Sequence, residues 1–136
     1  MSEKKTVLVV DDDPDFNNIT QSYLKKAGFL IKEAFNGVEA MEIINNEPPD
    51  AVVLDVMMPE KNGYQVCSEL KGDERFADIP ILLLTSVGSN VTSNQVSGQP
   101  TRYSHFSGMY TEADDYLEKT ASGEEIVQSI KKLIYG

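Results

Sequence analysis

The chain has 136 residues, of which 40% are hydrophobic and 25% are charged, and its formal net charge at pH 7 is -10. This length suits one globular domain with a real core. The excess of acidic residues argues against non-specific binding to nucleic acid. Because the sequence shows neither a long apolar run nor a signal-peptide pattern, we expect a cytoplasmic protein without a direct membrane or nucleic-acid partner.

Short apolar runs alternate with segments of helical periodicity along the chain. Runs of apolar residues without polar alternation are typical of strands buried on both faces, which predicts strands over 7–10, 51–55 and 79–84. The mixed segment 29–35 indicates a more exposed strand, and 113–118 indicates a last one. Strands that alternate with helices predict a parallel sheet with helices on both faces.

Helices are predicted over about 14–27, 37–46 and 63–72, and after Ser122. Each has an apolar stripe that we expect to be buried. The stripes are Phe16, Ile19, Tyr23 and Ala27; Val38, Met41 and Ile44; Val66, Cys67 and Leu70; and Ile126, Val127, Ile130, Leu133 and Ile134. Asp13, Asn36 and Ser122 are the expected N-caps.

The expected fold is therefore α/β and flavodoxin-like, a doubly wound five-stranded parallel sheet of strand order 2-1-3-4-5. Such a domain has five helices, and the sequence indicates four. The segment 87–112 is rich in Ser, Asn, Gln, Gly and Thr and has no sustained helical stripe. We expect it to stand in place of the fourth helix or around it.

Polar side chains follow four of the predicted strands: the pair Asp11 and Asp12, then Asp55, Thr85 and Lys119. If the strands are parallel, these side chains meet at one edge of the sheet. Carboxylate oxygens suit Mg²⁺ or Mn²⁺, and an ammonium with a hydroxyl group can neutralise a transferred phosphoryl group. Asp55, alone at its strand end, is the best nucleophile for an aspartyl phosphate, and the acid pair is better suited to hold the metal.

The arrangement resembles the receiver domain of two-component response regulators. The motifs that carry the resemblance are VLVVDDDP (7–14), LDVMMPEKNG (54–63), IPILLLTS (79–86) and ADDYLEK (113–119). The resemblance implies a single receiver domain over 1–136 that takes a phosphoryl group from a histidine kinase or a phosphotransfer protein. It is not an enzyme acting on external substrates, although it catalyses its own phosphorylation and dephosphorylation.

The resemblance also implies a role for each matching residue. Asp55 is the phosphoacceptor, Asp11 and Asp12 hold Mg²⁺ with it, and Met57 offers its backbone carbonyl to the metal. Thr85 matches the residue whose hydroxyl group moves toward the acyl phosphate. Lys119 matches the lysine that pairs with the acyl phosphate, and Tyr116 matches the aromatic switch residue.

Two features depart from the family pattern. Thr120 follows Lys119 where the family commonly has a cis proline, so we expect either a trans bond with a shifted Lys119 or a strained loop. The interval from Thr85 to Lys119 is also longer than the family usually has. Its aromatic and basic residues indicate a modified surface for a downstream partner, formed by 87–119 and the last helix.

Two other functions are compatible with part of this pattern. A degenerate pseudo-receiver would bind partners without phosphorylation, and Thr120 leaves that possibility open. A haloacid-dehalogenase-type phosphatase also uses an aspartate at a strand end, but it needs a second aspartate where this chain has Met57. The sequence stops at Gly136 after the last helix, so we expect no output domain. We expect the chain to be a stand-alone regulator, a relay shuttle or a fragment of a longer protein.

Overall fold

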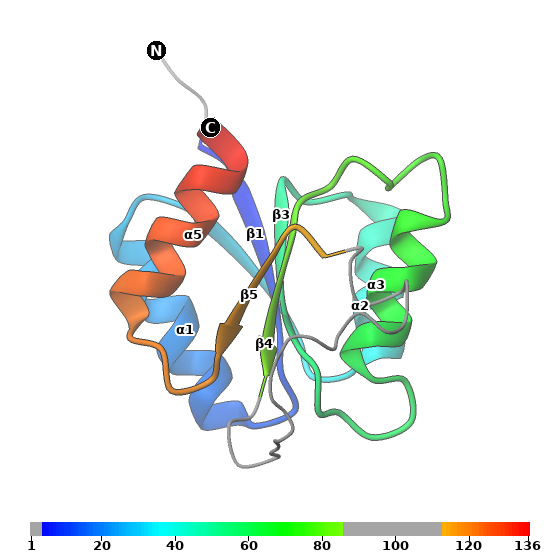
Figure 1. Ribbon diagram of the computed structural model, residues 1–136, viewed down its shortest axis with the longest axis horizontal. Helices are drawn as coiled ribbons and strands as arrows, with labels where there is room; N and C mark the ends of the chain where they lie inside the picture. The colour runs from blue at the N-terminus through cyan, green and yellow to red at the C-terminus, as the bar shows by residue number, and fades with distance from the viewer. Residues whose placement is uncertain (1–3, 86–112) are drawn as a thin grey trace.

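The computed structural model describes residues 4–85 and 113–136. Within them, five parallel strands form one sheet of order β2-β1-β3-β4-β5 (Figure 1). The strands are β1 (Thr6–Val10), β2 (Leu30–Ala34), β3 (Ala51–Asp55), β4 (Ile81–Thr85) and β5 (Asp115–Glu118). The predicted flavodoxin-like sheet and its strand order are confirmed.

Four helices lie in the described part of the chain: α1 (Pro14–Lys26), α2 (Gly37–Asn46), α3 (Gly63–Lys71) and α5 (Gly123–Tyr135). Helices α1 and α5 cover one face of the sheet, and α2 and α3 cover the other (Figure 1). The predictions about a fourth helix and about the irregular segment 87–112 lie outside the described residues.

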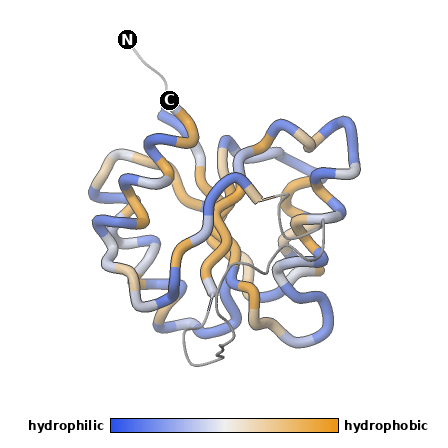
Figure 2. The backbone as a smooth tube through the Cα atoms, in the orientation of Figure 1, coloured by the Kyte–Doolittle hydropathy of each residue, from blue (hydrophilic) through white to orange (hydrophobic). Residues whose placement is uncertain are grey.

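The sheet separates two apolar clusters, because successive strand residues point to opposite faces. Leu8 and Val10 pack toward α2 and α3, whereas Val7 and Val9 pack toward α1 and α5. All five residues of β3 are buried. In Figure 2 the central strands are mostly hydrophobic, and the helices around them alternate between hydrophobic and hydrophilic residues. Burial on both faces explains why the central strands are continuous apolar runs.

The predicted apolar stripe of α1 is partly wrong. Ile19 is 52% exposed and Tyr23 is 42% exposed. The helix instead turns three polar residues and one leucine inward: Asn17, Thr20, Gln21 and Leu24. Hydrogen bonds from this polar face to the strand ends satisfy its buried groups, so the helix rotates away from the orientation that hydropathy alone favours.

The predicted burial of Val38 is also wrong, since this residue is 48% exposed. Ala40 and Ile44 form the buried face of α2, with Met41 packed beside them. The stripes of α3 and α5 are confirmed, although Leu133 and Ile134 are only partly buried.

Strands β4 and β5 each begin two residues later than predicted. An ion pair between Lys71 and Asp114 at 2.9 Å lies next to both starts. The Lys71 ammonium also donates to the carbonyls of Ala77 and Ile79, and Asp114 Oδ2 accepts from the Ile81 N–H. The Asp114 N–H in turn donates to the Ile81 carbonyl at 2.9 Å, so backbone and side-chain hydrogen bonds together join the amino ends of the two strands.

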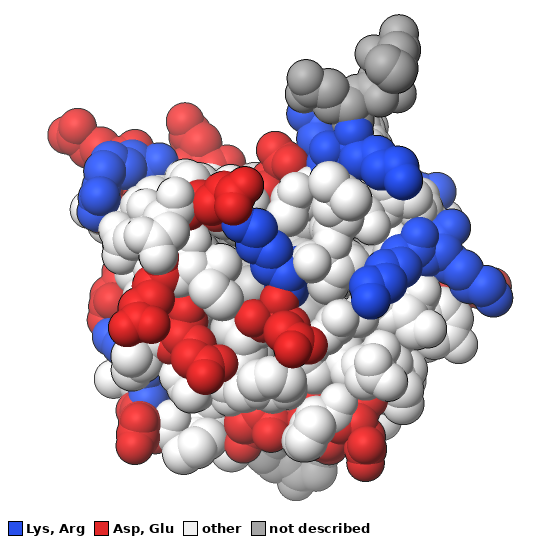
Figure 3. Space-filling view, turned by 180° about the vertical axis from the view of Figure 1, so that it is seen from behind, with Lys and Arg blue, Asp and Glu red and all other residues white. Residues whose placement is uncertain are grey.

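On the rear face of the molecule basic side chains gather at the upper right of the view, whereas acidic side chains are spread over its left and lower parts with a few basic ones among them (Figure 3). None of the helices in the described residues has the length and apolar character needed to cross a bilayer.

Candidate functional site

The carboxyl ends of β1 and β3 lie side by side at the lower edge of the sheet in Figure 1, and each end carries a buried carboxylate. Asp55 is the last residue of β3, and Asp11 follows β1 directly. Because Val10 pairs with Leu54, the two aspartates extend from neighbouring strands at the same level. Asp11 is 2% exposed and Asp55 is 1% exposed.

Asp12 completes an acidic cluster with these two residues. One carboxylate oxygen from each of Asp11, Asp12 and Asp55 lies within 4.8 Å of the others. The Oδ2 atoms of Asp11 and Asp55 are buried, and among the described residues they accept no hydrogen bond. Buried oxygens of like charge without donors are costly, and a hard divalent cation such as Mg²⁺ is the ligand that this donor set fits.

Backbone N–H groups orient both buried carboxylates. The Asp13 N–H donates to Asp11 Oδ1 at 2.9 Å, and the Met57 N–H donates to Asp55 Oδ1 at 3.2 Å. Asp13 itself is the N-cap of α1, as predicted, because its side chain accepts from the N–H groups of Asp15 and Phe16. The remaining carboxylate oxygens are left facing the cluster.

The Lys119 ammonium lies among these oxygens. Its Nζ atom is 3.0 Å from Asp11 Oδ2 and 3.3 Å from Asp55 Oδ2, within ion-pair distance but without hydrogen-bond geometry to either oxygen. It does donate to Asp11 Oδ1 at 3.2 Å. The bond to Thr120 is trans, as one alternative predicted, and Lys119 nevertheless reaches both carboxylates.

Burial and mutual repulsion shape the protonation of the cluster. Burial, followed by the charge of Asp11, raises the pKa of Asp55 to about 6, although Lys119 opposes the rise. Burial also raises the pKa of Asp11. Burial lowers the pKa of Lys119, but its hydrogen bond to Asp11 and the charge of Asp55 outweigh that effect and raise it.

Comparison with known proteins identifies the family. The model of the response regulator receiver domain matches residues 7–131. The chain belongs to this receiver domain family. It is 33% identical to the DNA-binding dual master transcriptional regulator RpaA of Synechocystis over 94% of its length, and 39% identical to the response regulator MprA of a Mycobacterium species over 94%.

The receiver domain spans about half the length of these curated relatives, 48% of RpaA and 50% of MprA. Two solved structures align along almost their entire length. The response regulator TrrA from Thermotoga maritima, in complex with Mg²⁺ and BeF, is 29% identical with a TM-score of 0.76, and covers 95% of this chain and 98% of its own. The receiver domain of the Francisella response regulator 1452 is 26% identical with a TM-score of 0.77, covering 96% and 97%.

The other predicted site residues of the receiver domain lie at the same edge or next to it. Thr85 is the last residue of β4 and follows Leu84, which pairs with Asp55. The Thr85 carbonyl accepts a hydrogen bond from the Lys119 N–H at 2.7 Å. Tyr116 lies on β5 with 40% of its surface exposed. Met57 is 58% exposed beside Asp55.

Sequence reasoning missed Asn17, which is 1% exposed behind the acid cluster. Its Nδ2 donates to the carbonyl of Asp11 at 3.1 Å and to that of Ala34 at 3.0 Å. Gln21 Nε2 donates to Asn17 Oδ1 and to Glu33 Oε1, both at 2.7 Å. No hydropathy pattern signals such a network, because a buried and an exposed asparagine look alike in sequence.

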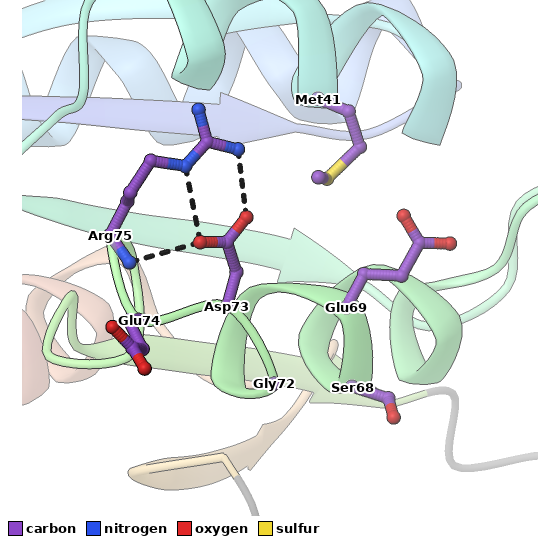
Figure 4. A pocket seen from close by; sticks show the side chains of 7 residues that line it. All are labelled: Met41, Ser68, Glu69, Gly72, Asp73, Glu74 and Arg75. Carbon is purple, nitrogen blue, oxygen red and sulfur yellow. Dashed lines mark hydrogen bonds and ion pairs between the residues drawn. The ribbon is translucent and has the colours of Figure 1, made fainter.

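A surface hollow of about 780 Å³ lies beside α3, and it shares no residue with the acid cluster. Its lining residues are Met41, Ser68, Glu69, Gly72, Asp73, Glu74 and Arg75 (Figure 4). Within it the Arg75 guanidinium donates two hydrogen bonds to Asp73, at 2.8 and 3.2 Å. Two of the five guanidinium donors of Arg75 therefore bind Asp73, and Glu69 forms an ion pair with Lys61.

Proposed function

We propose that this receiver domain is a phosphorylation-dependent signalling switch whose phosphoacceptor is Asp55. The observation that supports this most directly is the buried Asp55 Oδ2, which accepts no hydrogen bond and faces the Lys119 ammonium at 3.3 Å. A desolvated carboxylate oxygen beside a fixed cation suits attack on a phosphoryl group, whose developing charge the cation stabilises.

The proposed donor is the phosphohistidine of a histidine kinase or a phosphotransfer protein. An Asp55 oxygen bonds to phosphorus while the bond from phosphorus to the imidazole nitrogen breaks, and the leaving imidazole takes a proton from solvent. Asp11, Asp12 and Asp55, with the Met57 carbonyl, would hold Mg²⁺ or Mn²⁺, which neutralises phosphoryl oxygens when bound. Lys119 pairs with a further phosphoryl oxygen.

The switch proposal rests on where the remaining residues lie. A phosphoryl group on Asp55 adds charge and acceptor oxygens next to β4, where the Thr85 hydroxyl group can approach them. The space that Thr85 leaves then favours an inward position of the half-exposed Tyr116. In the described residues this change would affect β5 and α5, and we propose that a downstream protein partner binds on their side of the domain.

The deciding experiment is phosphorylation by acetyl phosphate with Mg²⁺, followed by intact-mass measurement. The wild-type protein should gain the mass of one phosphoryl group and Asp55→Asn should gain none. Asp78→Asn, which changes an exposed aspartate, is the matched control and should behave as wild type. A wild-type protein that stays unmodified while binding its partner would favour the pseudo-receiver. Continuous release of phosphate from phosphomonoesters would favour the phosphatase.

A further inference from the structure

The side chain of Phe16 faces the Lys119 ammonium across the site. The Nζ atom of Lys119 lies 4.6 Å from the centroid of the Phe16 ring. Phe16 is the third residue of α1, and the Asp13 cap holds its N–H at 3.4 Å. Its ring also packs against the apolar cluster between the sheet and the α1–α5 layer. The helix cap thus holds the backbone of Phe16, the apolar cluster supports its side chain, and its ring presents a face to the cation.

A cation at this distance from an aromatic face is attracted by the negative potential of the ring. The attraction is stronger where water is partly excluded, and the Lys119 side chain is only 22% exposed. Among the described residues the ammonium consequently has partners of two kinds: the carboxylates of Asp11 and Asp55, and the ring of Phe16.

A bound metal ion would affect these partners of the ammonium differently. In the proposed function the Asp11 oxygens bind the metal, so a divalent cation and the ammonium compete for them. The Phe16 ring offers no oxygen ligand and stays available to the ammonium when Asp11 is engaged. Lys119 is followed by Thr120, so no proline ring restricts the backbone after it. A contact to the Lys119 side chain is therefore more important for the position of its ammonium group.

We propose that Phe16 is a positioning residue whose ring holds the Lys119 ammonium beside Asp55 after a metal ion has bound to Asp11. This inference rests on the proposed function. It assigns to α1 a role in phosphorylation, although the acid pair itself lies before this helix, in the loop after β1.

The first test observes the contact itself by NMR. The ring current of Phe16 should displace the Lys119 CεH₂ signal upfield, and the signal is assigned by its loss in Lys119→Met. The displacement should persist with saturating Mg²⁺ and beryllofluoride and disappear in Phe16→Leu. Tyr23→Leu, which removes another aromatic ring from α1, should leave it unchanged. A signal that returns to the ordinary lysine position on addition of Mg²⁺ overturns the proposal.

The second test separates positioning from packing. At saturating Mg²⁺, Phe16→Leu should slow phosphorylation of Asp55 by acetyl phosphate roughly 2- to 30-fold, the range expected for a cation–π contact. Phe16→Tyr should restore the rate, and the Mg²⁺ affinity should stay within about twofold of wild type. An unchanged rate in Phe16→Leu, or an equal slowing when Lys119 is already Met, contradicts the proposal.

The two tests also distinguish this inference from the proposed function. If wild type is never phosphorylated, the proposed function fails, whereas the NMR contact still decides whether Phe16 holds Lys119 when Mg²⁺ is present. If wild type is phosphorylated and the contact is lost with Mg²⁺, only the inference about Phe16 fails.

Discussion

The Lys119 ammonium lies 3.0 Å from the Oδ2 atom of Asp11, 108 positions earlier in the chain. It therefore occupies part of the space that a divalent cation at Asp11 would need. We expect Lys119→Met to bind Mg²⁺ about tenfold more tightly, because the metal no longer displaces an ion pair. Isothermal titration calorimetry measures this, with Lys25→Met as the control for an equal change in net charge at an exposed site.

The same substitution should slow phosphorylation, since the phosphoryl group loses a cationic partner. A general loss of structure in Lys119→Met would weaken Mg²⁺ binding and slow phosphorylation. Tighter Mg²⁺ binding together with slower phosphorylation would therefore indicate a direct role of the ammonium group. Weaker Mg²⁺ binding in Lys119→Met would contradict it.

The raised pKa of Asp55, about 6 against an ordinary 3.8, predicts how the metal-free protein responds to pH. Because the folded state binds the Asp55 proton more tightly than the unfolded state, stability should fall as pH rises from about 4 to about 6. Asp55→Asn removes this contribution and should stabilise the metal-free protein by about 1–3 kcal/mol at pH 7.5. Urea unfolding at pH 4.5 and 7.5 measures the difference.

Asp78→Asn is the control for that pH series, because its carboxylate is exposed. Added Mg²⁺ should reverse the order of stability at pH 7.5, since wild type retains the Asp55 ligand and the variant does not. Equal stability of wild type and Asp55→Asn at both pH values would show that the buried charge carries no cost.

The exposed Met57 bears on how long a phosphoryl group would persist. An apolar side chain two residues after Asp55 does not orient an attacking water, and the sequence places the equally apolar Val87 two residues after Thr85. We expect slow self-dephosphorylation. The measurement is the decay of the phosphorylated mass after removal of acetyl phosphate, and a lifetime of seconds would contradict the expectation.

The acid cluster could be predicted from sequence because its members lie at the carboxyl ends of two apolar strands, Asp11 and Asp12 just after β1 and Asp55 as the last residue of β3, and parallel strands bring these ends together. The rotation of α1 could not. Hydropathy favours burial of Ile19 and Tyr23, whereas the structure buries Asn17 and Gln21. The free energy that decides the rotation comes from hydrogen bonds to strand ends, and a single sequence does not reveal where those partners lie.

Asn17 provides a direct test of that network. Asn17→Ala removes two donors from the carbonyls of Asp11 and Ala34 and leaves a small cavity, so we expect a loss of about 2–3 kcal/mol of stability. Mg²⁺ affinity should also fall, because Asp11 loses its support. Asn18→Ala is the matched control on the exposed face and should change stability by less than about 0.5 kcal/mol. Similar losses in the two variants would show that the network contributes nothing.

Gly63 allows the start of α3 to pack closely against the end of β3. A Cβ atom at this position would lie 2.5 Å from the Asp55 carbonyl oxygen and 2.8 Å from the Val56 Cα atom. Since both are backbone atoms, Gly63→Ala must displace α3 or the end of β3, and we expect a loss of at least about 2 kcal/mol together with weaker Mg²⁺ binding.

Gly72→Ala is the matched control, because its Cβ atom would meet its nearest neighbour only at 3.2 Å and the residue has an ordinary φ of -85° at the end of α3. It should cost less than about 1 kcal/mol and leave Mg²⁺ affinity unchanged. Chemical denaturation and calorimetric Mg²⁺ titration of both variants decide the matter. A Gly63→Ala protein as stable as Gly72→Ala, with wild-type Mg²⁺ affinity, would show that the contact between α3 and β3 does not hold Asp55 in place.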